Sequence, residues 1–340
     1  MIKTNLKSFS RDELTDWVLS IGEKTFRASQ IWSWLYQKNV TDFSCMSNIS
    51  RKFQITLNEK ASIYTLQLDR TKNSQTSKTV KFLWKLEDGH YIESVYIAEG
   101  KRRTFCISSQ VGCALGCRFC ATAKMGFIRN LDVHEIVEQV LSMQRQIGLK
   151  PTNLVVMGMG EPFLNYHNVI KALWIINHQD GLAIGYRKIT ISTSGIVPMI
   201  KRYSREKLPF QLAVSLNAAD NETRSSIMPV NRQFPLKQLI QAVKLYTKQA
   251  RKRITFEYVL IKGVNDSTDD ARRLLDLLSG IPCKVNLIAY NPTGELWDRP
   301  DDHRIYVFSD IIQPLCAPIT LRLSKGDDIN AACGQLAVYN

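Results

Sequence analysis

The first sixty residues carry hydrophobic positions at helical spacing. Residues 10–22 and 26–38 show it most clearly, because apolar side chains recur there every three or four positions. Ser10 stands before the first of these segments and Glu13 follows three residues later, which is the pattern of a helix-capping box. We therefore predict a small module of short helices in this part of the chain.

From about Tyr64 the pattern changes to a period of two. Residues 79–86 and 90–97 alternate between apolar and polar positions, and the turn-forming residues 87–89 separate them. This arrangement predicts a β-hairpin.

From residue 104 onward, short β-rich runs alternate with segments of helical periodicity. Strands are predicted over residues 104–108, 153–157, 188–192, 210–215, 254–260, 284–288 and 319–324. Helices are predicted over residues 132–148, 166–178, 197–204, 236–249, 268–279 and 304–315. Repeated strand–helix units form a parallel sheet covered by helices, and six or so units are too few to close an eight-stranded barrel. The expected fold is therefore α/β, with a partial and open barrel.

The predicted strands end in small or polar residues. Glu161 follows one strand, Ser192 and Ser215 end two others, and Asn291 follows a fourth. The carboxyl ends of parallel strands meet at one edge of the sheet, where such folds bind their ligands. We therefore expect these four side chains to share one cleft.

Composition and charge narrow the class of protein. Hydrophobic residues make up 44% of the chain, but none of its stretches approaches the roughly 18 apolar residues that a membrane span needs. The first residues also lack the apolar run of a secretory signal, so we expect a cytoplasmic protein with no membrane contact. The net charge of +14 would attract polyanions, and nucleic acid is the obvious partner.

The cysteine pattern adds a candidate chemistry. Three of the eight cysteines, Cys113, Cys117 and Cys120, lie within eight residues directly after the first strand of the alternating region. Thiolates are soft ligands that suit zinc or an iron–sulfur cluster. A structural zinc site needs four protein ligands, however, and the nearest candidate for a fourth is His134 on the following predicted helix. We therefore predict a [4Fe–4S] cluster on three cysteines, with a zinc site or a purely structural group of thiols as the alternatives. The isolated cysteines are expected to be small buried side chains: Cys45, Cys283 and Cys316.

The CxxxCxxC spacing on a loop after the first strand of a barrel resembles the signature of the radical S-adenosylmethionine (SAM) superfamily. Longer strings sharpen the resemblance: FCISSQVGCALGCRFCATAKMGF, GMGEP, ITISTSG, LIAYNP and GDDINAACGQL. Together they look like the RlmN family of adenine-C2 RNA methyltransferases, over about residues 20 to 336. The sister family Cfr, which methylates adenine C8, resembles the chain less and is the alternative.

The resemblance implies two cofactors and two further thiols. One iron of the cluster binds SAM, and two SAM molecules are consumed per turnover. One SAM methylates Cys333, and the radical made from the other activates that methyl group, which then adds to adenine C2. Cys106 releases the product by forming a disulfide with Cys333, which a thiol reductant must reopen. A flavodoxin-type protein is expected to supply electrons, and a monomer is expected.

The resemblance also assigns a proton acceptor and the SAM contacts. Glu93 would take the proton from C2, with Cys106 as its rival; alternatively, Glu93 is only a solvent-facing position of an alternating strand. The residues that match the family's SAM contacts are Gly160, Glu161, Ser192, Ser215, Leu216, Asn217 and Asn291. Asn217 departs from the family, which commonly has histidine there, so the side-chain hydrogen bond credited to that histidine is in doubt.

RNA binding is expected from the basic runs and from the amino-terminal module. The module mixes Arg27 with Trp32, Trp34 and Tyr36, although at least one of the tryptophans is expected to pack its core. The resemblance implies as substrates an adenosine in the peptidyl-transferase region of 23S rRNA and the adenosine beside the anticodon of certain tRNAs. A zinc-binding RNA protein without enzymatic activity is the remaining alternative.

These expectations divide the chain into three parts. Residues 1–62 form a helical RNA-binding accessory module, residues 63–103 a β-hairpin extension, and residues 104–340 the radical SAM core with the segment of Cys333 at its end.

Overall fold

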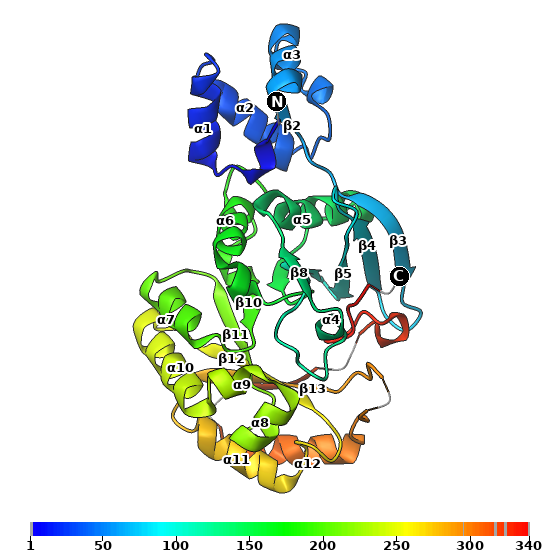
Figure 1. Cartoon of the computed structure of the whole chain (residues 1–340), viewed down its shortest axis with the longest axis vertical. Coiled ribbons are helices and arrows are strands. Elements are labelled where there is room, and N and C mark those ends of the chain that lie inside the picture. The colour runs from blue at the N-terminus through cyan, green and yellow to red at the C-terminus, as the bar shows by residue number, and fades with distance from the viewer. Residues whose placement is uncertain (1–2, 295, 316–317, 323–324, 339–340) are drawn as a thin grey trace.

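The computed structural model describes residues 3–294, 296–315, 318–322 and 325–338, and Cys316 lies outside them. A ten-stranded sheet runs through the molecule (Figure 1) in the order β14-β13-β12-β11-β10-β9-β6-β5-β4-β3. Its strands are β3 (Gln67–Asn73), β4 (Thr79–Lys85), β5 (Tyr91–Glu99), β6 (Arg102–Ile107), β9 (Asn153–Val156), β10 (Ile189–Thr193), β11 (Gln211–Ser215), β12 (Ile254–Leu260), β13 (Cys283–Ala289) and β14 (Ile319–Arg322).

The part from β6 to β14 is a parallel, open barrel wall. Each strand pairs in parallel with its neighbour, from β6 and β9 through to β14. The connecting helices follow the outer side of this wall in Figure 1: α5 (Val133–Ile147), α6 (Tyr166–Asn177), α7 (Val197–Arg205), α10 (Leu236–Ala250), α11 (Thr268–Leu278) and α12 (Asp302–Ile312). The predicted α/β partial barrel is confirmed.

The predicted hairpin is part of the same sheet. β4 and β5 pair in antiparallel fashion around the expected turn, and β5 continues the sheet by pairing with β6. A strand that the pattern did not predict, β3, adds an outer antiparallel edge. The extension is therefore a three-stranded continuation of the barrel sheet.

The amino-terminal module is helical, as predicted. It contains α1 (Arg11–Ser20), α2 (Phe26–Tyr36) and the unpredicted α3 (Arg51–Lys60). The capping box is present, since Ser10 and Glu13 each accept a hydrogen bond from the other's backbone. A short parallel pair, β1 (Thr4–Asn5) with β2 (Ala61–Ser62), joins the two ends of the module.

Buried contacts join the module to the barrel, beside α5 and α6 in Figure 1. The Lys7 ammonium donates to the carbonyl of Tyr64 at 2.7 Å and forms an ion pair with Glu138 of α5. Both side chains of this ion pair are 0% exposed. Trp32 is buried as well and its ring meets that of His178 at 5.0 Å between centroids. Trp32 therefore belongs to the core, as expected for one of the two tryptophans.

Within the described ranges, none of the helices is long and apolar enough to cross a bilayer.

Candidate active site

The three clustered cysteines lie on a loop that a two-stranded ladder closes. β7 (Gln110–Gly112) pairs antiparallel with β8 (Phe127–Asn130), and the loop between them carries the thiols. Gly112 has a φ of +73°, and a Cβ there would lie 1.9 Å from the carbonyl oxygen of Gly126. Only glycine fits this position, so the ladder can close tightly at the base of the loop.

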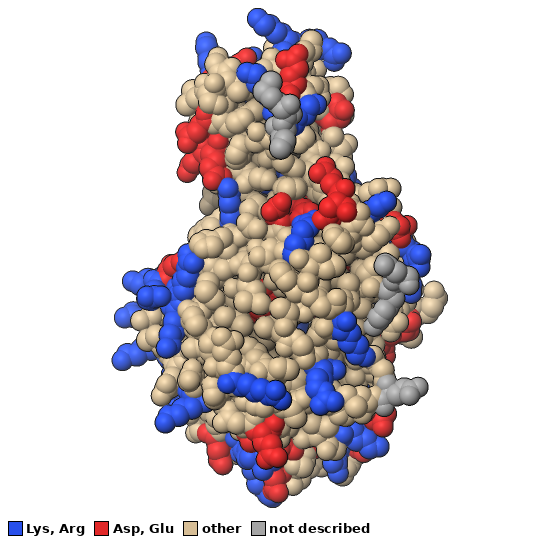
Figure 2. Space-filling model, viewed as in Figure 1, with Lys and Arg blue, Asp and Glu red and all other residues tan. Residues whose placement is uncertain are grey.

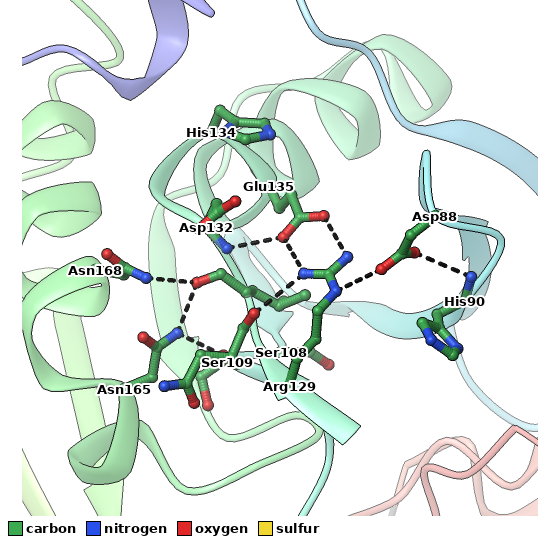
Figure 3. Close-up of polar contacts among 12 residues, drawn as sticks. Asp88, His90, Ser108, Ser109, Arg129, Asp132, His134, Glu135, Asn165 and Asn168 are labelled. Carbon is green, nitrogen blue, oxygen red and sulfur yellow. Dashed lines mark hydrogen bonds and ion pairs between the residues drawn. The ribbon is translucent and has the colours of Figure 1, made fainter. Parts of the chain in front are cut away.

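An arginine ties this ladder to two other elements (Figure 3). Arg129 of β8 donates two hydrogen bonds of 2.8 Å to the carboxylate of Glu135 at the start of α5, and it pairs with Asp88 in the β4–β5 turn. A bidentate arginine–carboxylate contact fixes orientation as well as distance. The cysteine loop is therefore anchored both to the barrel and to the extension.

The three thiols form a donor set suited to an iron–sulfur cluster. Burial is the main cause that raises the pKa of Cys113, to about 12, and a nearby Cys120 adds to it. Burial likewise raises the pKa of Cys117, followed by the charges of Cys120 and Cys113, so the thiols are close neighbours. Three soft thiolates can each bind a different iron of a [4Fe–4S] cluster. The donor set therefore fits the predicted cluster.

The zinc alternative gains no support. His134, the nearest candidate for a fourth ligand, contacts Ser8 at 3.0 Å and packs edge-on against Tyr64. Among the residues described by the structure, no three His, Cys, Asp or Glu side chains converge as a single metal ion requires.

The loop after β9 packs closely against β7. Gly160 has a φ of +97°, and a Cβ there would lie 2.5 Å from the side chain of Gln110. The Glu161 carboxylate is buried and accepts hydrogen bonds from the backbone N–H groups of Phe163 at 3.0 Å and Ser194 at 2.8 Å. Burial, as the main cause, raises the pKa of Glu161. One carboxylate oxygen thus binds the segment after β9 and the other binds the segment after β10. Their remaining lone pairs could accept hydrogen bonds from a ligand.

A buried arginine holds the ends of β10 and β11. Arg224 of α8 (Asn221–Ile227) is 0% exposed and donates to the carbonyls of Leu216 at 2.9 Å, Ser194 at 2.8 Å and Ser215 at 3.2 Å. Burial lowers its pKa to about 10, against the opposing effect of Cys117. Among the residues that the structure describes, no carboxylate pairs with this cation, which lies near Cys117.

The side chain of Asn217 makes contacts within the protein. It has a φ of +59°, and its side chain accepts from the N–H of Val259 at 2.9 Å and donates to the sulfur of Met228 at 3.2 Å. Asparagine tolerates this left-handed backbone better than most residues. Its side chain is already engaged with protein, and Leu216 is buried in the core, so both can meet a ligand chiefly through backbone atoms.

The segment of Cys333 lies across the cysteine loop. The carbonyl of Gly334 accepts from the N–H of Ala121 at 2.7 Å, and the carbonyl of Leu336 accepts from the Thr122 hydroxyl at 2.5 Å. Asn291, at the end of β13, donates to the carbonyl of Cys333 itself at 3.2 Å. These bonds hold Cys333 at the carboxyl edge of the barrel.

Cys333 and Cys106 face the same interior. Cys333 is exposed at the surface, and burial is the main cause that raises its pKa. Burial first, and Cys333 second, raise the pKa of Cys106 on β6 to about 12. Two thiols more than 200 positions apart in sequence therefore influence each other's ionisation.

Glu93 is buried beside this segment. It forms an ion pair with Lys81 at 2.8 Å and accepts a hydrogen bond from the N–H of Ala337 at 3.0 Å. Burial raises its pKa, and Lys81 is the largest opposing cause. The idea that Glu93 is a solvent-facing strand position is wrong, because the barrel and the segment of Cys333 cover its strand.

Two buried charged residues of this region, Arg224 and Glu257, were not predicted from the sequence. Arg224 lies in a polar stretch that gave no hint of burial. Glu257, the single acid of the apolar strand β12, is 5% exposed, and one of its carboxylate oxygens is buried without a hydrogen-bond partner. A single acidic residue in an apolar strand could have indicated a candidate site residue from the sequence.

Comparison with known proteins agrees with this geometry. Residues 4–63 match the family model of the ribosomal RNA large subunit methyltransferase N-terminal domain, and residues 107–276 match that of the radical SAM superfamily. A crystal structure of a radical SAM methyltransferase from Sphaerobacter thermophilus superposes with a TM-score of 0.94. It is 41% identical, and the match covers 98% of this chain and 99% of that one.

Relatives of similar length extend the match. The dual-specificity RNA methyltransferase RlmN of Syntrophobacter fumaroxidans is 45% identical over 334 residues, which are 97% of both chains. A probable dual-specificity RNA methyltransferase RlmN of Thermotoga neapolitana is 46% identical over 332 residues, covering 98% of this chain and 97% of the relative. The superfamily works with a [4Fe–4S] cluster and SAM, and the donor set described above suits both. The chain therefore belongs to the RlmN family of SAM-dependent RNA methyltransferases within the radical SAM superfamily.

Proposed function

We propose that this protein methylates carbon 2 of adenosine in RNA by way of a methylated Cys333. The observation that carries the proposal is the set of contacts directly after Cys333, where Gly334 and Leu336 bind the cysteine loop and Ala337 binds Glu93. Carbon 2 of adenine is a poor nucleophile, so polar transfer of a methyl group from SAM is not available. A cluster on Cys113, Cys117 and Cys120 would supply, together with SAM, a 5′-deoxyadenosyl radical.

The remaining roles fall to residues of the chain. Cys333 accepts a methyl group, loses its thiol proton and becomes S-methylcysteine. Its methyl group would give a hydrogen atom to the 5′-deoxyadenosyl radical, and the resulting carbon radical would form a bond to C2. One electron must leave this adduct together with the C2 proton, and that electron would be taken up by the cluster. Glu93 accepts the proton that C2 must lose. Cys106 then attacks the sulfur of Cys333, so that a disulfide forms and the carbon–sulfur bond breaks, and the carbon that leaves takes up a proton to become the new methyl group.

SAM is proposed to bind at the carboxyl edge of the barrel. Gly160, Glu161, Ser192 and Ser215 follow or end neighbouring strands there, together with the backbone of 216–217 and Asn291. Their carboxylate, hydroxyl and amide groups suit the ammonium, ribose and carboxylate of SAM. Two SAM molecules per turnover, a flavodoxin-type electron donor, a thiol reductant and a monomeric enzyme belong to the same proposal.

The substrates are proposed to be 23S rRNA and tRNA. The relatives named above carry the description of dual-specificity RNA methyltransferases, and the chain resembles them over nearly its whole length. Residues 1–62 are proposed to act as an RNA-binding accessory module, residues 63–103 as the strand extension, and residues 104–340 as the catalytic core.

Two cysteine variants test the mechanism. Cys333→Ala should abolish RNA methylation while the anaerobically purified protein keeps its iron, and Cys106→Ala should accumulate RNA joined covalently to protein. Cys45, which was expected to be buried, is in fact exposed in the amino-terminal module, so Cys45→Ala is the matched control and should behave as the wild type. Digestion of the RNA and mass spectrometry against C2- and C8-methyladenosine standards reads out the product. Free C2-methyladenosine from either active-site variant would overturn the roles of Cys333 and Cys106, and C8-methyladenosine from the wild type would favour the Cfr-like alternative.

A further inference from the structure

One face of the continuous sheet connects the barrel interior with the outer strand. Residues paired across neighbouring strands point their side chains to the same face. Lys72 of β3 pairs with Lys81 of β4, Lys81 with Val95 of β5, and Val95 with Cys106 of β6. The side chains of the outer strands therefore continue the row that begins at Cys106 inside the barrel.

A cavity of about 440 Å³ opens between this face and the segment of Cys333. This volume is within the usual range for ligand pockets, roughly 300 to 1,000 Å³. The cavity is lined on one side by the extension, including Arg70, Lys72, Lys81 and Glu93, and on the other by the cysteine loop, the segment after β13 and the segment of Cys333, including Asn330 and Ala337. It therefore leads from the molecular surface to the proposed proton acceptor.

The inner end of this cavity is neutral, whereas its outer rim is positively charged. At the inner level, Lys81 and Glu93 neutralise each other, and the Lys81 ammonium also donates to the carbonyl of Asn330 at 3.1 Å. At the outer level, Arg70 and Lys72 are exposed, and among the described residues neither forms an ion pair. Two cations thus stand uncompensated at the rim of a cavity whose inner end is neutral.

We propose that Arg70 and Lys72 bind the RNA backbone phosphate beside the target adenosine, while its base reaches into the cavity. This inference rests on the proposed function and adds to it the path of the RNA backbone along the rim of the cavity. A base that is to react must leave its stack, and its phosphodiester remains outside, where cations can contact it. Arginine offers a planar pair of donors to phosphate oxygens, and the edge position of β3 leaves room for the strand to approach.

A second basic surface competes with this one. Figure 2 shows Lys and Arg side chains gathered at the left edge of the molecule, over α7 and α10. Lys244 and Lys248 are exposed on α10, away from the proposed active site. They provide a control that reverses the same number of charges on the rival surface.

The test is RNA binding by the holoenzyme over a series of salt concentrations. Fluorescence anisotropy with a labelled RNA hairpin that carries the target adenosine compares the wild type, Arg70→Glu/Lys72→Glu and Lys244→Glu/Lys248→Glu. We expect the first pair to weaken binding at least tenfold and to reduce the salt slope by about 0.7 to 0.9 for each phosphate that is no longer neutralised. The α10 pair should stay within twofold of the wild type. The variant Arg70→Lys/Lys72→Arg keeps both charges and should keep the slope, which separates the effect of charge from disturbed folding.

The outcomes separate this inference from the proposed function. Unchanged affinity and slope in Arg70→Glu/Lys72→Glu, or a larger loss in the α10 pair, overturns the phosphate site even if the wild type methylates RNA. Conversely, the proposed function fails if the wild type forms no C2-methyladenosine, whatever the binding data show. Peptide mass spectrometry of Cys333 adds a further check, because S-methylcysteine should form equally in the wild type and in Arg70→Glu/Lys72→Glu.

Discussion

Two buried lysine–glutamate pairs stand at two junctions of this protein, and they differ in what surrounds them. Lys7 and Glu138 join the amino-terminal module to α5, with both side chains 0% exposed. Lys81 and Glu93 join β4 to β5 at a cavity, with side chains 8% and 6% exposed. The first pair is enclosed on all sides, whereas the second opens toward the segment of Cys333.

The difference in enclosure separates a structural role from a chemical one. Burial lowers the pKa of Lys7, and Glu138, which also pairs with Arg145, is the largest cause that opposes this effect, so the lysine depends on that carboxylate to stay charged. Burial raises the pKa of Glu93, which makes this carboxylate a better proton acceptor at the edge of a cavity. The same two side-chain types thus serve as a joint in one place and as a candidate base in the other.

Breaking the enclosed pair should have the largest effect on folding. Lys7→Met leaves the buried Glu138 carboxylate with only Arg145 and Ser142 as partners, and removal of one partner of a buried ion pair costs up to about 3–5 kcal/mol. Urea unfolding followed by tryptophan fluorescence measures this loss. Lys3→Met, at an exposed position four residues earlier, is the control and should change stability little. A loss below about 1 kcal/mol for Lys7→Met, the size typical of an exposed pair, would show that the junction does not depend on this pair.

Neutralising the cavity pair should affect catalysis instead. Glu93→Gln keeps the size of the side chain but cannot accept a proton, so formation of C2-methyladenosine should fall at least about hundredfold, as general-base removal typically does. Glu87→Gln, an exposed acid in the turn of the same hairpin, serves as the control. Full activity of Glu93→Gln would assign proton removal to another group, with Cys106 as the first candidate.

The pH dependence sharpens the contrast. Glu93 must be ionised to accept a proton, and its pKa is raised above 4.5, so the rate should rise with pH through that higher value. In Lys81→Met the inflection should move to still higher pH, because the lysine is the largest cause that lowers the pKa of Glu93. Single-turnover rates at a series of pH values measure both. An inflection at the same pH in the two proteins would contradict the coupling.

An exposed ion pair at the first junction should have the smallest effect. Lys171 of α6 and Glu13 of α1 pair across the module and the barrel with side chains 34% and 46% exposed. Lys171→Ala should cost less than about 1 kcal/mol, because solvent screens such a pair. Urea unfolding beside Lys7→Met tests whether enclosure, and not the junction itself, makes the difference.

Much of the barrel could be predicted from periodicity. Each helix predicted after residue 130 is present, and its observed ends lie within three residues of the predicted ones. This agreement is expected because the helical spacing of apolar residues is a local property of the chain. β3 escaped prediction because Gln67–Asn73 is polar on both faces and almost wholly exposed. Of the predicted strand over 319–324, residues Ile319–Arg322 form β14 and the last two lie outside the described residues.

The candidate site was predictable only in part. The spacing of Cys113, Cys117 and Cys120 indicates a cluster because all three thiols lie on one loop, and a loop is local. Alternation in residues 90–97 could not decide whether Glu93 faces solvent, since both faces of a hairpin strand look alike until another segment covers one of them. Asn217 was assigned by position in a motif, but the left-handed backbone turns its side chain toward β12.

Local patterns in the chain were thus enough to specify the helices, the parallel strands and a loop of three soft ligands, because each depends on residues close in sequence. The meeting of Cys106, Glu93 and Cys333 depends on the pairing of β5 with β6 and on hydrogen bonds between segments more than 200 residues apart. The burial of Arg224 and the two uncompensated cations at the cavity rim have the same origin. Burial and charge balance are properties of the packed molecule, because they depend on which segments the fold brings together.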